Sequence, residues 1–218
     1  MGKFIVLDGL DGSGKETQTN LLAARLRGAG EDVKVLSYPR YGEKSAVPVE
    51  LYLNGFLGER PDDTGAYAAS VLFAVDRYLS YRLEWQADYE KGNFTFLANR
   101  YTSSNAVHQL SKLPRGEWDA FLDWLWDFEY GKLGIPHPDR VLYLEMRPDL
   151  SRRLIEQRGN AQDIHERDPS YLSRCYEAAL YAADRLRWTT VRCFEGDRIL
   201  SIEEISALID ESVFSPKQ

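Results

Sequence analysis

Residues 4–17 read FIVLDGLDGSGKET and contain the clearest indication of the fold. The apolar, branched run at residues 4–8 ends directly in glycines, which is typical of a buried parallel strand. From residue 15 to about residue 27 leucines and small residues recur at helical spacing, and Gly28 and Gly30 provide a stop. Strand, glycine loop and helix therefore follow one another in the order that a phosphate-binding loop requires.

The chemistry of this loop follows from its backbone and from two side chains. Successive amides of a glycine loop converge on an anion, and the following helix adds the positive end of its dipole. Lys15 supplies a point charge for the outer phosphates, but Glu16 stands where the common pattern has Ser or Thr. Glu16 either points its carboxylate to solvent from the first helical turn, where the dipole favours an acid, or binds magnesium as a hard oxygen ligand.

Asp11 lies inside the loop, in front of the predicted phosphate position. A carboxylate there would repel a nucleotide unless it binds a metal ion or orients a substrate group. This position favours phosphoryl transfer to an acceptor that is held close by. A signalling GTPase is not indicated, because the chain has no NKxD guanine motif.

The composition limits the class of protein. The chain has 218 residues, 44% of them hydrophobic, which suits one domain with a single core. Its formal net charge of −7 argues against nucleic acid or an anionic membrane as the main partner. The apolar runs are too short for a signal peptide or a membrane span, and Cys175 and Cys193 form no CxxC pair. We therefore expect a soluble cytoplasmic protein.

Strands and helices alternate along the rest of the chain. Further strands are predicted at residues 32–39, 94–101, 140–146 and 189–195, and further helices at residues 66–85, 117–131, from Pro148 onward and at 169–187. A last helix opens with Ser201, which has Glu204 at capping-box spacing. This alternation predicts an α/β fold with a mostly parallel sheet that is covered on both faces.

Five more stretches follow the loop in a specific order. They are YPRYG at residues 38–42, LFAVDRY at 72–78, NRYTSSN at 99–105, LGIPHPD at 133–139 and DIHE at 163–166. Together with GLDGSGKET, these stretches resemble the thymidylate kinase family over about residues 3–200. The ordered set is far more specific than the loop alone.

The resemblance implies a three-layer P-loop NTPase fold with a mostly parallel five-stranded sheet flanked by helices. It implies one nucleoside-monophosphate-kinase-like domain at residues 1–218, with a short lid at about residues 157–166. It also implies transfer of the γ-phosphate of Mg²⁺-ATP to dTMP by a homodimer, so that ATP and dTMP are the expected partners. One face of the predicted helix at residues 66–85 could serve the core or a dimer interface: Ala69, Ser70, Phe73 and Tyr81.

On the donor side, the resemblance assigns ATP binding to the whole loop. The residues are Gly9, Leu10, Asp11, Gly12, Ser13, Gly14, Lys15, Glu16 and Thr17. Loops of this family often end in Lys, a variable residue and Thr, so Thr17 is the constant hydroxyl and Glu16 is no defect. Lys15 and Asp11 are predicted to be catalytic, and Asp11 and Glu16 are the candidate magnesium ligands.

On the acceptor side, Phe73 and Arg77 are four residues apart on one face of a predicted helix. The resemblance implies that the ring stacks on thymine while the guanidinium reaches a base carbonyl. The alternative is that Phe73 is a core residue and Arg77 a member of a surface ion pair. Arg100, a predicted catalytic residue, follows a strand's carboxyl end, and its fork suits the acceptor phosphate. The predicted dTMP-binding residues are Tyr38, Arg40, Tyr41, Phe73, Arg77, Arg100, Ser104, Asn105 and Glu166.

The predicted lid contains the remaining catalytic candidate. Position 12 is glycine, where some family members have arginine, so we expect Arg158 of the lid to neutralise the charge that develops between donor and acceptor. The alternative is that Arg158 merely ends its helix at the favourable end of the dipole. His165 stands where some relatives have an aromatic residue that disfavours a ribose 2′-hydroxyl. His165 either has this selective role or is a hydrogen-bonded residue at a helix end.

The main departure from the family pattern is Asn99, which precedes Arg100 where the family usually has Asp. The missing carboxylate removes a magnesium or water partner and shifts that role towards Asp11 and Asp8. Two alternatives to a dTMP kinase therefore stay open. One is a kinase for another deoxynucleotide, and the other is a catalytically weakened regulatory paralogue that binds nucleotides.

Overall fold

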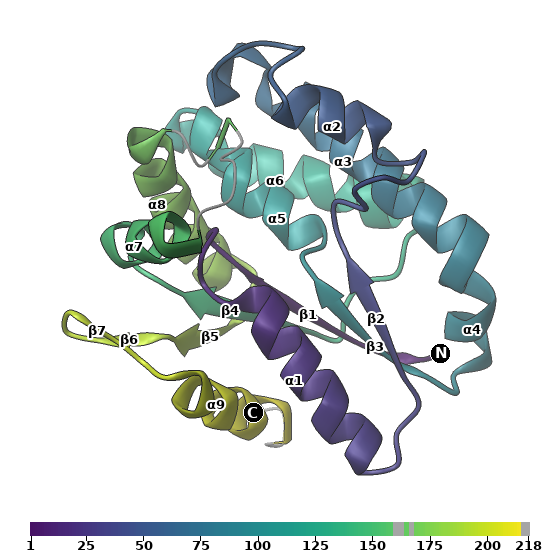
Figure 1. The fold of residues 1–218 in the computed structure, drawn as a ribbon. Helices are drawn as coiled ribbons and strands as arrows, with labels where there is room; N and C mark the ends of the chain where they lie inside the picture. Colours follow the sequence, from purple (N-terminus) through teal and green to yellow (C-terminus); the bar gives the residue numbers. More distant parts are fainter. Residues whose placement is uncertain (159–163, 166–167, 215–218) are drawn as a thin grey trace.

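A five-stranded sheet organises the chain, and the computed structural model describes residues 1–158, 164–165 and 168–214. The strands are β1 (Lys3–Gly9), β2 (Val33–Ser37), β3 (Thr95–Asn99), β4 (Arg140–Glu145) and β5 (Thr189–Arg192). They lie in the order β2-β3-β1-β4-β5, and every neighbouring pair is parallel. The parallel sheet and its flanking helices confirm the predicted α/β fold (Figure 1).

Helices connect the strands. They are α1 (Lys15–Gly28), α2 (Val47–Leu53), α3 (Ala66–Ser80), α4 (Gln86–Lys91), α5 (Thr102–His108), α6 (Trp118–Trp126), α7 (Pro148–Arg158), α8 (Pro169–Arg185) and α9 (Ile202–Phe214). Shorter turns are η1 (Pro61–Asp63), η3 (Leu110–Lys112) and η4 (Arg115–Glu117) of the 3-10 type, and η2 (Tyr81–Trp85) and η5 (Asp127–Lys132) of the π type. None of the helices in the described residues combines the length and the apolar character that a membrane span requires.

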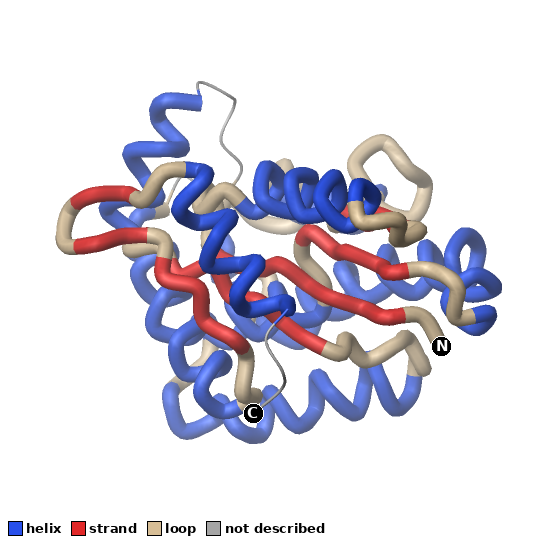
Figure 2. Tube along the Cα trace, turned by 90° about the horizontal axis from the view of Figure 1, so that it is seen from below, coloured by secondary structure: helices blue, strands red, loops and turns tan. Residues whose placement is uncertain are grey.

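The alternation of side chains along β1 explains why helices cover both faces of the sheet. Ile5 and Leu7 pack on one face with Leu26 of α1 and with residues of α9. Phe4 and Val6 point to the other face, where they pack with aromatic residues of η2 and α4. Figure 2 shows helices above and below the strands. Each large apolar side chain that is buried in this way contributes about 1.5–3 kcal/mol.

Two predictions for the C-terminal part of the chain have different outcomes. The capping box is confirmed, because the Glu204 amide donates to Ser201 Oγ at 3.2 Å and the Ser201 amide donates to Glu204 Oε2 at 2.7 Å. The prediction of one strand at residues 189–195 is wrong. After β5 the chain leaves the sheet, and Phe194 pairs with Ile199 in an antiparallel hairpin of β6 (Phe194–Glu195) and β7 (Arg198–Ile199).

The parallel arrangement places distant segments at one edge of the sheet. The glycine loop follows β1, Tyr38 follows β2, and Arg100 follows β3. The carboxyl ends of parallel strands lie at the same edge, which is where open α/β sheets bind ligands. The fold therefore brings the predicted donor and acceptor segments together.

Candidate active site

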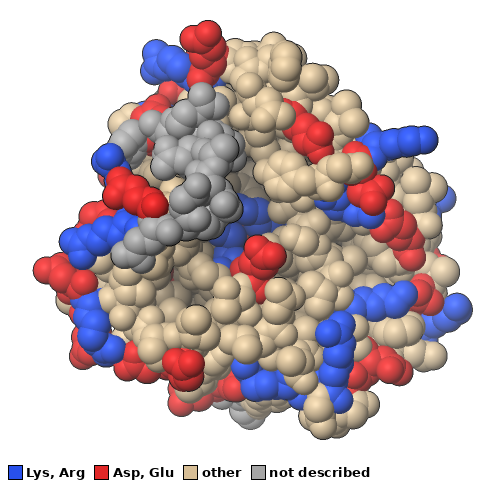
Figure 3. Space-filling model, viewed as in Figure 1, with Lys and Arg blue, Asp and Glu red and all other residues tan. Residues whose placement is uncertain are grey.

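A cleft of about 930 Å³ lies at this edge of the sheet. Figure 3 shows a hollow in which basic and acidic atoms lie next to each other. The predicted site residues that line the cleft are Asp11, Gly12, Ser13, Gly14, Lys15, Glu16, Thr17, Tyr38, Tyr41, Phe73, Arg77, Arg100, Ser104 and Asn105. Gly9, Leu10 and Arg40 are not among the lining residues. One cleft thus contains most of the donor-side and acceptor-side predictions.

The glycine loop turns sharply into α1 and encloses a lysine. Gly14 has a φ of 82°, a left-handed conformation that glycine adopts without steric cost. Lys15 is 7% exposed, and its Nζ donates to the Leu10 carbonyl at 2.7 Å. Ser13 Oγ is buried and has no hydrogen-bond partner within the described residues. Because an unpaired buried hydroxyl is costly, Ser13 suits a position next to a polar ligand.

Gly12 cannot be replaced by arginine without rearrangement. Its φ is 78°, and a Cβ there would lie 2.8 Å from the carbonyl oxygen of Ser151. The structure therefore explains why the loop has no arginine at this position. Arg158 is the last residue of α7, but its side chain lies outside the described part of the molecule, as does Glu166.

Glu16 and Thr17 lie in the first turn of α1, where both side chains are exposed at the cleft. The helix dipole favours an acid in this turn. Both interpretations of Glu16, the solvent-facing acid and the magnesium ligand, are compatible with this position.

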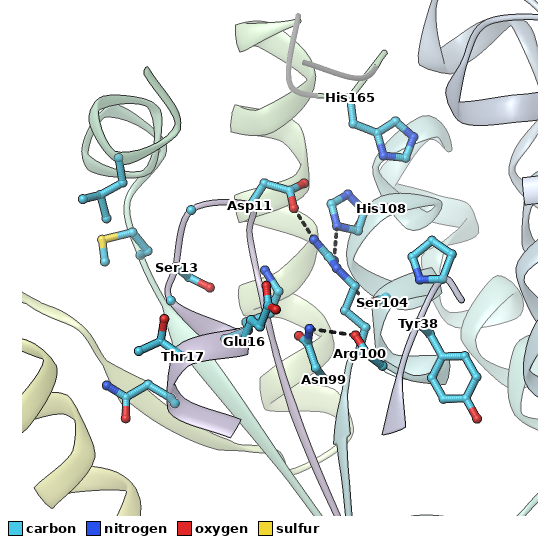
Figure 4. Close-up of a pocket in the computed structure, with 18 of the residues that line it drawn as sticks. Asp11, Ser13, Glu16, Thr17, Tyr38, Asn99, Arg100, Ser104, His108 and His165 are labelled. Carbon is cyan, nitrogen blue, oxygen red and sulfur yellow. Dashed lines mark hydrogen bonds and ion pairs between the residues drawn. The ribbon is translucent and has the colours of Figure 1, made fainter. Parts of the chain in front are cut away.

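Arg100 joins the acceptor side of the cleft to the glycine loop (Figure 4). Its Nη2 forms an ion pair with Asp11, and its Nη1 donates to Ser104 Oγ at 3.3 Å. Burial alone would raise the pKa of Asp11, but the charges of Arg100 and Lys15 outweigh burial and hold this pKa well below its usual value. Asp11 is therefore ionised, and its charge is already balanced before an anion arrives.

Asp8 connects β1 to α5 from beneath the cleft. Its side chain is fully buried and accepts hydrogen bonds from the Gly9 amide at 2.8 Å, Ser103 Oγ at 2.6 Å and Ser104 Oγ at 2.8 Å. Hydroxyl and amide donors thus occupy both carboxylate oxygens. This arrangement makes Asp8 an anchor of the loop rather than a ligand that faces the cleft.

Two stacked histidines, His108 and His165, lie next to Arg100. Only His165 was identified as a candidate from the sequence. His108 Nε2 lies 3.0 Å from Arg100 Nη1, which can only donate, so Nε2 is the acceptor and Nδ1 bears the proton. The rings of His108 and His165 are stacked with centroids 5.3 Å apart, and His165 Nε2 lies 2.8 Å from Tyr52 Oη. Burial lowers the pKa of His108 well below its usual value and that of His165 to about 3. Both rings are neutral.

The lowered pKa values of His108 and His165 predict that the protein loses stability in mild acid. In the unfolded chain a histidine binds a proton below about pH 6.5. In the folded state the pKa of His165 is about 3, so this ring stays neutral until the pH falls to that value. The unfolded state therefore binds more protons in this window, and each such histidine weakens the folding equilibrium by up to about tenfold per pH unit as the pH falls. We expect urea unfolding at pH 7, 6 and 5 to give decreasing free energies of unfolding.

The variant His165→Phe keeps an aromatic ring and removes the titrating group. Its free energy of unfolding is expected to change less with pH than that of the wild type. His137→Phe, at an exposed histidine, is the matched control. An unchanged slope in His165→Phe would contradict this assignment.

The base side of the cleft contains a buried carboxylate that sequence reasoning missed. Arg77 is 1% exposed, and its Nε and Nη2 donate to Glu129 Oε2 at 2.7 Å and Oε1 at 2.6 Å. Asn105 Nδ2 also donates to Glu129 Oε1, at 3.1 Å. Phe73 lines the same part of the cleft. The available signal was Glu129, one of two acids within the aromatic run WLWDFEY, at a position that helical spacing buries.

The predicted phosphate-side cluster at residues 38–41 is divided by the fold. Tyr38 is buried and its hydroxyl lies 3.0 Å from Ser80 Oγ, while Tyr41 is 63% exposed at the cleft. The guanidinium of Arg40 instead forms an ion pair with Glu84. The geometry therefore gives no support to Arg40 as a dTMP ligand.

Asn99 lies at the end of β3 and lines the cleft. Its Nδ2 donates to Ser37 Oγ at 3.1 Å, whereas its buried Oδ1 has no hydrogen-bond partner within the described residues. Among residues 1–158, 164–165 and 168–214, no group of three or more His, Cys, Asp or Glu side chains is placed so that it could hold a metal ion. A cation bound here would need oxygens from other sources, such as Asn99 Oδ1, Thr17 and the ligand itself.

Comparison with known proteins places this geometry in a family. The family model described as thymidylate kinase matches residues 7–198. A thymidylate kinase of Mycobacterium tuberculosis is 30% identical over 185 residues, which cover 82% of this chain and 84% of the relative. A probable thymidylate kinase of Pyrococcus abyssi is 30% identical over 75% of this chain and 74% of the relative. A thymidylate kinase of Arabidopsis thaliana is 28% identical over 76% of this chain and 56% of the relative. The chain belongs to the thymidylate kinase family.

Proposed function

We propose that this protein transfers the γ-phosphate of ATP to dTMP and releases dTDP and ADP. The observation that carries the proposal is the ion pair between Asp11 of the glycine loop and Arg100 of the acceptor side. It means that a donor phosphate on the loop and an acceptor phosphate on Arg100 would meet in one cleft. Phosphoryl transfer requires mainly this positioning, together with stabilisation of charge.

On the donor side, the loop amides and Lys15 bind the phosphates of ATP. Lys15 is held over the loop by the Leu10 carbonyl, so its charge is preorganised. Arg158 is our proposed second cation, since Gly12 leaves no room for an arginine in the loop. Lid closure at about residues 157–166, with Glu166 near the substrate sugar, is part of this proposal and would exclude water from the reaction.

On the acceptor side, Arg100 grips the phosphate of dTMP, and Tyr38, Tyr41 and Ser104 line the space around it. Arg100 can release Asp11 in exchange for a phosphate oxygen, and Asp11 then orients the reacting groups. Phe73 stacks on the face of the thymine ring, while Arg77 and Asn105 meet the polar edge of the base.

Magnesium is the proposed cofactor. When bound, it would neutralise charge on the phosphates of ATP. The residues fit a weakly held cation: Asn99 Oδ1 is a buried oxygen with no hydrogen-bond partner among the described residues, and Thr17, Glu16 and Asp11 line the same cleft. Because Mg²⁺ usually keeps several waters and substrate oxygens, few protein ligands are needed. Asn99 therefore does not favour a regulatory paralogue without activity.

A turnover assay with ATP, Mg²⁺ and dTMP tests the function, with dUMP, dCMP and dGMP as competing acceptors. We expect kcat/KM to be higher for dTMP than for dCMP, because thymine, like uracil, offers an N3–H donor and an O4 acceptor to the groups in the cleft, whereas cytosine has the reverse polarity at both positions. A preference of more than tenfold for another nucleotide would instead identify a kinase for that nucleotide. Binding of ATP and dTMP without turnover would identify the regulatory alternative.

We also propose that the protein forms a homodimer in the cytoplasm. Large apolar side chains are exposed on α2, on α3 and between them: Val47, Leu51, Phe56, Leu57, Tyr67 and Val71. The other face of α3 is not available for a dimer, because Ala69, Ser70 and the neighbouring Tyr81 are already buried within the single chain. Both cysteines are buried free thiols, which suits a reducing compartment.

Sedimentation velocity tests the dimer. We expect a species of twice the 25.0 kDa chain mass, and Val71→Glu, which places a charge on the exposed apolar face, is expected to shift it to the monomer. Glu203→Gln on α9, away from this face, is the control. A wild-type protein that sediments only at the chain mass rejects the proposal.

A further inference from the structure

Glu129 lies at the centre of a buried polar network behind the base side of the cleft. Its side chain is 0% exposed. Its Oε2 accepts hydrogen bonds from Arg77 Nε at 2.7 Å and Thr102 Oγ1 at 2.9 Å, and its Oε1 accepts from Arg77 Nη2 at 2.6 Å and Asn105 Nδ2 at 3.1 Å. The carboxylate in η5 thereby ties α3 to α5. Each of its oxygens accepts two hydrogen bonds.

The network determines which part of Arg77 is available. Glu129 holds Nε and Nη2 in a bidentate pair, so these donors point away from a ligand. The remaining amino group, Nη1, makes no hydrogen bond to the described residues, and Arg77 lines the cleft. Arg77 therefore offers the cleft a donor in a fixed direction.

The same network determines the orientation of the Asn105 amide. Its Nδ2 lies 3.2 Å from the Ser70 carbonyl oxygen and 3.1 Å from Glu129 Oε1. Both partners are acceptors that cannot donate, so the amino group of Asn105 must face them. The amide oxygen, which has the opposite polarity, then faces the cleft. Without Glu129, the two ends of the amide would be much less clearly distinguished.

We propose that Glu129 selects the pyrimidine by fixing the polarity of Arg77 and Asn105, an inference that rests on the proposed function. The cleft presents a donor from Arg77 and an acceptor from Asn105. Thymine and uracil carry the matching O4 acceptor and N3–H donor, whereas cytosine carries an N4 donor and an N3 acceptor. Cytosine therefore meets like against like at both positions, and buried groups left unpaired in this way disfavour it.

Two variants test this role. Glu129→Asp keeps the charge that Arg77 needs but shortens the side chain by one methylene, so it cannot reach both Arg77 and Asn105. Glu129→Gln keeps the length and replaces one acceptor oxygen by an amino group, which allows the Asn105 amide to turn. In both variants we expect the ratio of kcat/KM for dCMP to that for dTMP to rise by on the order of tenfold. The ratio of dUMP to dTMP is expected to stay unchanged, because uracil and thymine share one polarity.

A merely structural role gives a different result. It would lower kcat/KM for dTMP, dUMP and dCMP by a common factor, and unchanged ratios in folded Glu129→Asp would overturn the proposal. Circular dichroism and urea unfolding establish that the variants are folded; Glu129→Asp is the safer of the two because it leaves no unpaired buried charge. Glu145→Gln, at a buried carboxylate that contacts Tyr176 and Arg192, is the matched control and should leave the ratios unchanged. A wild-type protein that does not phosphorylate dTMP would reject the proposed function itself, whereas an active wild type with unchanged ratios in the variants rejects only the role of Glu129.

Discussion

Replacing Lys15 by alanine is expected to lower kcat by about 10³-fold, the largest effect of any single substitution in the donor loop. Lys15 is buried, and its Nζ is held at 2.7 Å from the Leu10 carbonyl, so its charge is already in place when phosphates arrive. A fixed charge in a water-poor site stabilises developing negative charge more than a mobile one in solvent does. The measurement is the initial rate at saturating ATP, Mg²⁺ and dTMP.

The loss of Lys15 has a second consequence within the loop. The charge of Lys15 helps to lower the pKa of Asp11 against the effect of burial, so this pKa is expected to rise in Lys15→Ala. Lys91→Ala removes an exposed lysine of α4 and serves as the control, with an unchanged rate. If Lys15→Ala kept more than a tenth of the wild-type rate, the loop would not bind the donor phosphates in the way proposed.

Arg100→Ala is expected to lower kcat/KM for dTMP by about 10²- to 10³-fold. Two effects add, because the variant loses the proposed phosphate ligand and also leaves the Asp11 carboxylate without its ion-pair partner in the cleft. The uncompensated charge of Asp11 would then repel the incoming phosphates. Steady-state kinetics with dTMP as the varied substrate measure the effect, and we expect KM for dTMP to increase more than KM for ATP.

A double variant separates the two effects. Asp11→Asn combined with Arg100→Ala removes the repulsive charge and is expected to recover part of the dTMP affinity, although not the full rate. Arg82→Ala, at an exposed arginine of η2, is the control for loss of a positive charge. Equal affinity for dTMP in Arg100→Ala and the wild type would show that another residue binds the acceptor phosphate.

Much of the fold was predictable because its signals are local in the sequence. The run at residues 4–8, the glycines after it and Lys15 lie within one short stretch, and local sterics are sufficient to form the glycine loop between β1 and α1. The capping box of Ser201 and Glu204 is local in the same sense, and its two hydrogen bonds formed as expected. Alternation of strands and helices then led to the parallel sheet.

The partners of the predicted residues could not be read from the chain. Arg77 and Glu129 are 52 positions apart, and their contact depends on how α3 and η5 pack against α5. The sequence left Arg77 as either a base ligand or an ion-pair member. In the fold, its Nε and Nη2 pair with Glu129, and the residue also lines the cleft. In the same way, nothing local distinguishes Arg40, which turns to Glu84, from Tyr41, which lines the cleft.

The sequence by itself therefore determined the class of fold, the glycine loop and most of the residues that gather in the cleft, because periodicity and short motifs are encoded by neighbouring positions. Only the tertiary structure decided the charge balance of Asp11 with Arg100, the neutral state of His108 and the polarity that Glu129 imposes on Asn105. Burial and hydrogen-bond partners set these properties, and both arise only when segments that are distant in the sequence pack together.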